Sequence, residues 1–380
     1  MKKIVILLPI VFAIAGTSFV SYSFLDTFII PKNTRKVDID NNISAFFDFS
    51  SSPLLGSSKS SQISQSSQNS QISQTSQDTP PASKDGYYED LTEEQIAALF
   101  KPTKEFREKE YYSDPDIYIN ITTHRDAANT TTYYVADVRI RHLSYFRTAL
   151  AKDTFGENVE ERPSDICKKK KGILAINGDY YGAQEAGYVL RNGTSLRSTV
   201  SNSTGGVNPR NNPEDLAIYA DGTFEVFNEK EHTLKEIADK RAWQVFSFGP
   251  GLVKNGEVAV SETAEVDSII RNGTSLKSQR TAIGIISPLH YCFVVNDGRT
   301  DESEGFSLYE IANIMKGLHC YCAYNLDGGG SSVMYLDNGT GNADKLGHLV
   351  NKPNQNYNGR GSSQTQQRGI SDIVYIGKDS

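Results

Sequence analysis

Several motifs that define common sites are missing from this chain. Its four cysteines include no pair with the C-x₂-C spacing of a zinc site. The six histidines are scattered, and none has a partner at metal-ligand spacing. The sequence also lacks a P-loop, an H-E-x-x-H helix and a G-x-S-x-G turn. These absences argue against a His-based metal site and against a His-based catalytic triad.

The cysteines leave two interpretations open. Small buried apolar side chains are the simpler one, and we favour it over a disulfide. Cys320 and Cys322 are two positions apart on a strand-like run. We therefore expect them to point to the same face of that strand.

An excess of basic residues is also absent. The chain has 39 Lys and Arg against 46 Asp and Glu, a formal net charge of −7. Binding to nucleic acid calls for a basic patch, so no nucleic-acid partner is expected. An anionic substrate would have to be bound by particular arginines or backbone amides, because the overall field does not attract it.

Only the N-terminus has a long apolar run. Lys2 and Lys3 precede uncharged residues 4–25, which are enough to cross a bilayer as a helix. Ala13-Ile14-Ala15 offers a cleavage site as the alternative. We favour an uncleaved membrane anchor in residues 1–30, with the two lysines in the cytoplasm. Both interpretations place the main domain outside the cytoplasm.

Composition divides the rest of the chain. Residues 31–85 are assigned to a linker, whose Ser- and Gln-rich part from position 50 cannot bury enough apolar surface to fold. Residues 86–111 form a helical lead-in, with an amphipathic helix over 93–100. Residues 112–380 are expected to form the compact domain.

Hydrophobic periodicity within this domain predicts mostly strands. They are expected over residues 117–122, 132–140, 173–176, 217–219, 290–296, 320–326, 333–336 and 373–376. The clearest helix covers 308–316, with Ser307 and Glu310 as a capping box and Gly317 at its end. The predicted fold class is α+β, a strand-rich mixed sheet with a few flanking helices and one β-α-β crossover.

The crossover joins strands 290–296 and 320–326 through the capped helix, so the two strands are expected to be parallel. The polar loops that follow them would then lie at one edge of the sheet, where open α/β sheets bind ligands. If the strands lie close together, Asp297, Arg299, Asn325 and Asp327 converge there.

A glycine loop follows Asp327. Gly328, Gly329 and Gly330 lack Cβ atoms, so their backbone can approach a ligand, and their amides can form a nest for an anion. Ser331 and Ser332 add hydroxyl groups. At a predicted strand end, this loop indicates a site.

Other clusters have simpler explanations when each is taken alone. Asn177-Gly178-Asp179 and the segment 247–252 are typical of turns, and Arg280 is typical of a solvated surface. Residues 191–196 recur as residues 271–276, which two similar turns explain.

In chain order, however, these clusters resemble the phosphodiester glycosidase family. The matching pieces are AINGDYYG (175–182), FGPGLVKNG (248–256), RTAIG (280–284), VVNDGR (294–299), GFSLYEIANIM (305–315), NLDGGGSS (325–332) and RGISDIVYI (368–376). The chain departs from the family pattern at Gln279 and Gln367, where Pro and Glu are usual.

The resemblance implies hydrolysis of the bond between a sugar C1 and a phosphate oxygen, on a cell-surface or exported glycan. It proposes Asp179, Asp297 and Asp327 as catalytic carboxylates, with their roles unassigned. The expected substrate-binding residues are Asn177, Arg280, Arg299, Asn325, Gly328, Gly329, Gly330, Ser331 and Ser332. No cofactor or metal is assigned, although Asp-rich loops could hold a divalent cation. A non-catalytic envelope module that binds anionic polysaccharide, and a glycosyl transferase, are the alternatives.

Overall fold

A computed structural model describes residues 30–41, 43–47, 92–101, 110–201, 213–262, 277–337, 347–354 and 366–378. The predicted anchor over residues 4–25 and most of the predicted linker lie outside these ranges. Within the ranges, no helix has both the length and the apolar character needed to cross a membrane.

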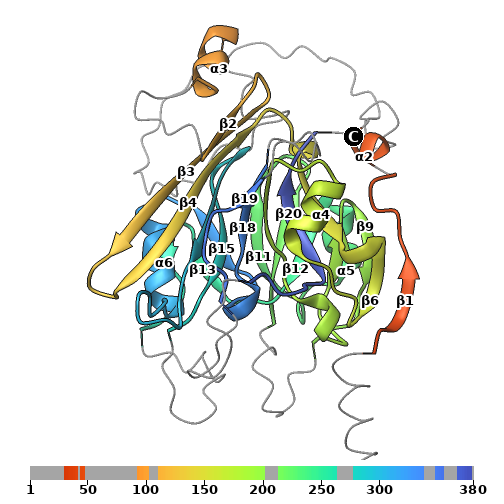
Figure 1. Ribbon diagram of the computed structural model, residues 1–380. Coiled ribbons are helices and arrows are strands. Elements are labelled where there is room, and N and C mark those ends of the chain that lie inside the picture. The colour runs from red at the N-terminus through yellow and green to blue at the C-terminus, as the bar shows by residue number, and fades with distance from the viewer. Residues whose placement is uncertain are drawn as a thin grey trace, which may run out of the picture.

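Strands dominate the structure (Figure 1). They are β1 (Lys32–Lys36), β2 (Tyr111–Ser113), β3 (Ile117–Asp126), β4 (Thr131–Ile140), β5 (Phe146–Leu150), β6 (Thr154–Glu157), β7 (Leu174–Asn177), β8 (Val189–Arg191), β9 (Thr194–Arg197), β10 (Glu214–Tyr219), β11 (Phe224–Asn228), β12 (Ala242–Ser247), β13 (Gly251–Lys254), β14 (Glu257–Val258), β15 (Thr281–Ser287), β16 (His290–Asn296), β17 (Cys322–Asn325), β18 (Met334–Leu336), β19 (His348–Leu349) and β20 (Asp372–Ile376). The α-helices are α2 (Ile43–Phe47), α3 (Glu93–Leu99), α4 (Pro163–Lys169), α5 (Leu234–Asp239) and α6 (Leu308–Gly317).

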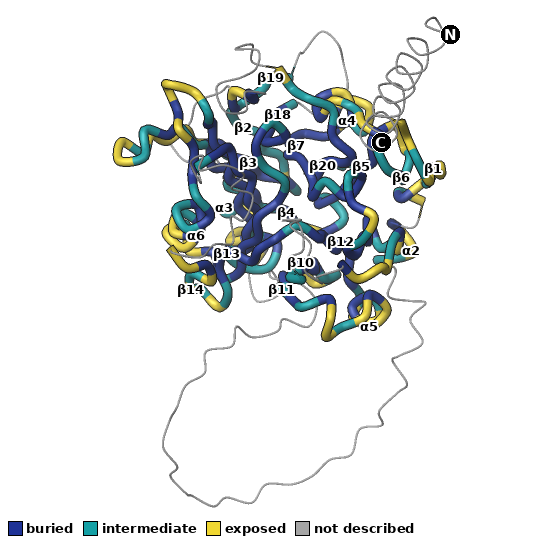
Figure 2. The backbone as a smooth tube through the Cα atoms, turned by 90° about the horizontal axis from the view of Figure 1, so that it is seen from below, coloured by how far each residue is buried: buried dark blue, intermediate teal, exposed yellow. Residues whose placement is uncertain are grey.

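Three sheets surround the main hydrophobic core. Their strand orders are β14-β13-β17-β15-β16-β4-β3-β2, β19-β18-β7-β20-β5 and β11-β10-β12-β8-β9. Figure 2 shows β7 and β20 as buried tubes toward the middle of the molecule, with exposed loops, α5 and β14 at its rim.

Alternation along the strands explains why one sheet has apolar neighbours on both faces. In β16, Tyr291, Phe293 and Val295 face the main core. Cys292 and Val294 face the opposite side, where α6 packs. The eight-stranded sheet therefore separates the main core from a second core beneath α6.

Each predicted strand and helix has a counterpart, with bounds shifted by a few residues. The capping boxes of α6, at Ser307 and Glu310, and of α3, at Thr92 and Gln95, are both present. The end of α6 differs from the prediction. Gly317 is its last helical residue, and the left-handed conformation that follows belongs to His319, with φ 62°.

The predicted mixed sheet is wrong, because every strand pairing in the described residues is antiparallel. β16 and β17 each pair antiparallel with β15, which lies between them, so they run in the same direction without touching. The prediction of a mixed sheet failed because β15 was not predicted as a strand. A short turn at Pro288 and Leu289 joins it to β16, and it takes the position beside that strand.

The expected common face of Cys320 and Cys322 is also wrong. β17 begins at Cys322, so Cys320 lies in the preceding turn, outside the regular alternation. Cys320 packs beneath α6, whereas Cys322 packs in the main core.

The N-terminal part of the predicted linker packs on the domain. β1 pairs with β6, and Phe46 and Phe47 of α2 contact Trp243 at ring distances of 4.9 and 4.8 Å. Asp40 adds an ion pair with Lys170 at 2.9 Å. Residues 32–47 have several aromatic and charged side chains, unlike the Ser- and Gln-rich part that follows, so the linker boundary was placed too early in the chain.

Candidate functional site

Strand direction brings the predicted site loops to one edge of the eight-stranded sheet. β16 and β17 end at Asn296 and Asn325, and β15 begins just after Arg280. Because β15 runs opposite to both neighbours, its first residue lies beside their last ones, with Thr281 opposite Val295 and Ala282 opposite Asn325. Arg280, Asp297 and Asp327 are therefore gathered at this edge.

Asn177 joins this edge to the sheet that contains β7. Its Nδ2 donates to the carbonyl of Asp327 at 2.7 Å, and its Oδ1 accepts from the Thr281 hydroxyl at 2.8 Å. The amide of Val333 donates to the same Oδ1 at 3.2 Å. Asn177 is 1 % exposed, so this side chain positions the loop, and protein groups already occupy both ends of its amide.

The glycine loop is shaped by steric demands. A Cβ at Gly328 would lie 2.9 Å from the carbonyl of Gln279, and Gly329 has φ 60°. A Cβ at Gly329 would lie 3.1 Å from Nη1 of Arg299. The absence of side chains therefore lets segment 279–280 and the Arg299 guanidinium lie against the loop.

The expected amide nest is partly occupied by the protein itself. The Gly328 amide donates to Oδ1 of Asp327 at 2.8 Å, and the Gly329 amide donates to the carbonyl of Gln279 at 2.9 Å. Gly330 lies in the same 3₁₀ turn, Gly329–Ser331. An anion at this loop would therefore contact arginine side chains more than the amides of Gly328 and Gly329.

Two arginines flank the loop. Arg280 is buried, and its Nε donates to the carbonyl of Phe306 at 3.1 Å. Arg299 has a left-handed backbone, with φ 59°, which a non-glycine residue seldom adopts. This conformation accompanies the placement of its guanidinium beside Gly329.

Asp327 has a third arginine in its surroundings. It is partly exposed, and its charge acts on Arg368. The Arg368 guanidinium lies 5.4 Å from the ring centre of Tyr180, which is itself left-handed at φ 66°. Burial works to lower the pKa of Arg368, but Asp327 and Tyr180 outweigh it and raise that pKa.

Asp297 is the second carboxylate at this edge. Its Oδ2 accepts from the Tyr134 hydroxyl at 2.9 Å, and its Oδ1 accepts from the Lys352 amide at 2.8 Å. Burial raises its pKa above the ordinary value for an aspartate.

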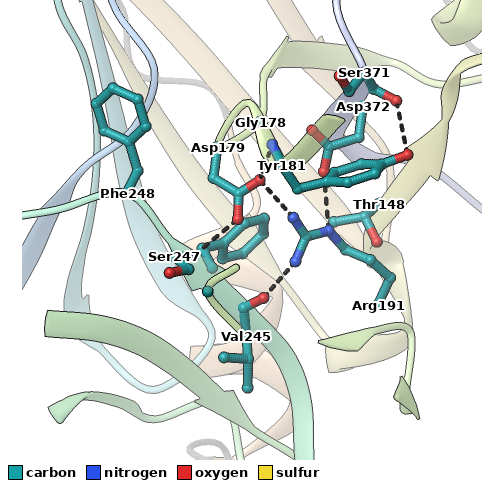
Figure 3. A network of polar contacts seen from close by, with 12 residues as sticks. Thr148, Gly178, Asp179, Tyr181, Arg191, Val245, Ser247, Phe248, Ser371 and Asp372 are labelled. Carbon is teal, nitrogen blue, oxygen red and sulfur yellow. Dashed lines mark hydrogen bonds and ion pairs between the residues drawn. The ribbon is translucent and has the colours of Figure 1, made fainter. Parts of the chain in front are cut away.

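Asp179 lies in a buried ion network with Arg191 and Asp372 (Figure 3). Arg191, fully buried, forms ion pairs with Asp179 at 2.7 Å and with Asp372 at 2.9 Å. The Ser247 amide donates to the other oxygen of Asp179 at 2.8 Å. Burial raises the pKa of Asp372 to about 7, and the nearby Arg191 opposes this shift.

This network positions the neighbouring turn. The Gly178 amide donates to the Asp372 carbonyl at 3.0 Å, and the Asp327 amide donates to the Gly178 carbonyl at 3.3 Å. A Cβ at Gly178 would lie 2.1 Å from Oδ1 of Asp372, so only glycine fits.

Three other predicted residues have buried polar atoms with no hydrogen-bond partner among the described residues. Asn325 donates from Nδ2 to the Gly249 carbonyl at 2.8 Å, but no described group donates to its Oδ1. The hydroxyls of Ser331 and Ser332 are likewise buried, with no partner in the described part of the chain. Orphaned polar atoms of this kind are costly unless water or a ligand satisfies them.

Several residues described above were not in the predicted set, among them Tyr180, Arg191, Arg368, Asp372 and Tyr134. Arg191 stood in a repeat that looked like a turn, and its second copy, residues 271–276, lies outside the described residues. Tyr180 and Arg368 lie within the motifs that carry the family resemblance. Their position in those motifs could have identified them as site residues. Metal ligands are a separate question: the described residues contain no group of three or more His, Cys, Asp or Glu placed to hold a metal ion.

The fold and the site together define a β-sheet protein with a carboxylate and several arginines at one sheet edge, an arrangement suited to an anionic substrate. The family model of the phosphodiester glycosidases matches residues 170–376, which include all of these residues. The chain belongs to the phosphodiester glycosidase family.

Two relatives are similar to part of the chain. The chain is 30% identical over 174 residues to human N-acetylglucosamine-1-phosphodiester alpha-N-acetylglucosaminidase, covering 44% of this chain and 32% of the relative. It is 27% identical over 178 residues to the SPbeta prophage-derived uncharacterized protein YomE of Bacillus subtilis, covering 47% and 26%. The chain therefore spans about a quarter to a third of the length of these two relatives.

A solved structure shares the fold. The catalytic domain of zebrafish N-acetylglucosamine-1-phosphodiester alpha-N-acetylglucosaminidase, auto-inhibited by its pro-peptide, superposes with a TM-score of 0.51. The alignment covers 71% of this chain and 86% of the zebrafish chain at 22% identity.

Proposed function

We propose that this protein is a hydrolase that cleaves the bond between sugar C1 and a phosphate oxygen in a glycosyl-1-phosphodiester. The observation that carries the proposal is the placement of Asp327. Its partly exposed carboxylate interacts electrostatically with Arg368, at the start of a glycine loop that holds Arg299. A carboxylate is suited to an electron-poor sugar carbon, and arginines are suited to the phosphate.

Such a substrate has a good leaving group. A phosphomonoester departs as a stable anion, so general-acid assistance contributes less than in ordinary glycoside cleavage. The site must mainly hold the phosphate and stabilise positive charge on the sugar. Arg299 and Arg368 are the proposed phosphate ligands, with Arg280 behind the loop.

The three predicted carboxylates then have different proposed roles. Asp327 acts on C1, as nucleophile, as base toward water, or as cation stabiliser. Asp297 is the second carboxylate of the pair, held by the Tyr134 hydroxyl and the Lys352 amide. Asp179 is fully buried, with both oxygens accepting hydrogen bonds, so it acts by positioning the 178–180 turn.

The sugar and the cellular location are extensions of the same proposal. The names of the vertebrate relatives motivate an N-acetylglucosamine-1-phosphodiester, here on a cell-surface or exported glycan. The apolar residues 4–25 motivate export and membrane anchoring. Asn325 Oδ1 and the two serine hydroxyls are proposed to bind the sugar or the water that attacks it.

Hydrolysis in heavy-oxygen water tests the reaction directly. The full chain is incubated with a panel of sugar-1-phosphodiesters, and the phosphomonoester product is analysed by phosphorus NMR. Cleavage at C1 leaves the phosphate unlabelled, which is the expected result. Heavy oxygen in the phosphate would mean attack at phosphorus and would overturn the proposal.

The same experiment separates the alternatives. A transferase would form a new glycoside when a sugar acceptor is added, in place of free sugar. A non-catalytic envelope module would bind the phosphodiester without turnover. Asp327→Asn, prepared in parallel, shows whether any turnover comes from a contaminant, because a contaminant's rate does not depend on this residue.

A further inference from the structure

Two of the four cysteines face each other. Cys292 lies on β16, and Cys320 lies in the turn between α6 and β17. Their sulfur atoms are 3.0 Å apart, and both side chains are buried beneath α6. Cys167 and Cys322 belong to other core clusters.

A glycine on the intervening strand makes this contact possible. Gly284 of β15 is directly opposite Cys292 in the sheet register. A Cβ at Gly284 would lie 2.7 Å from the sulfur of Cys320 and 2.6 Å from Cε of Met315. Without that Cβ, the Cys320 side chain reaches across β15 to Cys292.

We propose that Cys292 and Cys320 form an intramolecular disulfide in the exported protein. A disulfide has a sulfur–sulfur distance of about 2.05 Å, so small side-chain rotations close the remaining gap. A metal is a poorer explanation, because zinc takes about four ligands and the described residues contain no cluster of three His, Cys, Asp or Glu. The proposal rests on export, since cytosolic thiols are kept reduced.

The oxidation is a thiol–disulfide exchange with an exported disulfide, either an oxidoreductase or a small-molecule disulfide. One cysteine thiolate attacks the oxidant and forms a mixed disulfide. The second thiolate displaces the oxidant's sulfur, and the oxidant leaves with two electrons and two protons as a dithiol or two thiols.

Folding sets the time at which this exchange must occur. The contact with Cys320 and burial raise the pKa of the Cys292 thiol well above its usual range. The folded Cys292 thiol is therefore a poor nucleophile, and both sulfur atoms are buried, so the bond forms before α6 covers them.

The bond would act on the elements that carry the site. The two cysteines are 28 positions apart, and the loop they close contains α6 and the Asp297–Arg299 segment. Closing such a loop restricts the unfolded chain and ties β16 to the start of β17. The expected effect is on stability, with turnover at low temperature unchanged.

Peptide mapping tests the pairing. The full chain, exported by an oxidising host, is unfolded and alkylated without reductant and then digested with trypsin. Peptides 281–299 and 317–345 should appear linked, and alkylated Cys167 should appear in its own peptide. Because peptide 317–345 also holds Cys322, the link should persist in Cys322→Ser and vanish in Cys320→Ser. Alkylation of all four cysteines, or a link through Cys322, would overturn the proposal.

Thermal unfolding with and without reductant gives a second readout. Reduction should lower the melting temperature of the wild type and of Cys322→Ser by about 5–10 °C. Cys292→Ala and Cys320→Ala should show no response to reductant. An equal response in all four proteins would contradict a Cys292–Cys320 bond, whatever the catalytic activity of the chain.

Discussion

The carboxylates of the site differ in their exposure to solvent. Asp179 and Asp297 are buried, and each accepts hydrogen bonds on both oxygens. Asp327 is partly exposed, at the start of the glycine loop. At the scale of single residues, Asp327 is therefore best placed to meet a substrate.

Asp327→Asn tests that role. The substitution keeps size and most hydrogen bonding but removes the charge, so kcat should fall by at least about 10²-fold with an unchanged melting temperature. Asp179→Asn is the matched comparison, and it should lose stability because it weakens a buried ion pair. Near-full turnover of Asp327→Asn with intact substrate binding would remove this carboxylate from the mechanism.

Arg299→Lys probes the phosphate contact. A lysine keeps the charge but cannot form the two parallel hydrogen bonds of a guanidinium. We expect KM to rise by about tenfold or more, since a hydrogen bond to a charged group contributes about 1.5–3 kcal/mol, while kcat changes less. Steady-state kinetics on a sugar-1-phosphodiester measure both. An unchanged KM would show that Arg299 does not contact the substrate.

At the scale of elements, Arg191 connects β8 to the 178–180 turn and to β20. It pairs with Asp179 and Asp372, and its Nη1 donates to the carbonyl of Val245 on β12. Arg191→Met would leave two carboxylates buried without their cation. The free energy of unfolding should fall by about 3–5 kcal/mol, measured by urea denaturation. A loss below about 1 kcal/mol would mean that the network contributes little to stability.

Asp372 makes stability depend on pH. Its folded pKa of about 7 lies above the ordinary value of 3.8, mainly because of burial. Between these values the folded state binds more protons than the unfolded state, so this group's contribution to stability falls as pH rises from about 4 to about 7. Asp372→Asn mimics the protonated form and should flatten this part of the stability profile. Identical profiles for the two proteins would contradict the assignment.

At the scale of the whole molecule, the packed N-terminal segment predicts how the chain responds to proteolysis. The Ser- and Gln-rich stretch from residue 50 should be cleaved first. The N-terminal piece should nevertheless co-elute with the core on gel filtration, because β1 pairs with β6 and α2 packs on Trp243. The double variant Phe46→Ala, Phe47→Ala should release it. Immediate separation of the wild-type pieces would show that this packing is too weak to persist.

Local patterns accounted for the elements with the clearest periodicity, but not for the remaining elements or for their arrangement. The capping box of α6 and the alternation of β16 depend on residues a few positions apart, so they could be predicted. β15 was missed because its motif was interpreted as a cluster around Arg280. Without that strand, the neighbours of β16 and β17 could not be assigned correctly.

The sequence by itself determined the positions of the strands and helices with clear periodicity, the polar loops at the ends of β16 and β17, and the family to which the motifs belong. Only the tertiary structure decided which polar groups pair with one another through hydrogen bonds and ion pairs. The Arg191–Asp372 pair spans 181 positions, and the contact of Asn177 with Asp327 spans 150. Such contacts depend on how whole sheets pack together, and no local spacing encodes that. The same packing decided that Cys292 meets Cys320, because the space between them exists only where Gly284 crosses beneath α6.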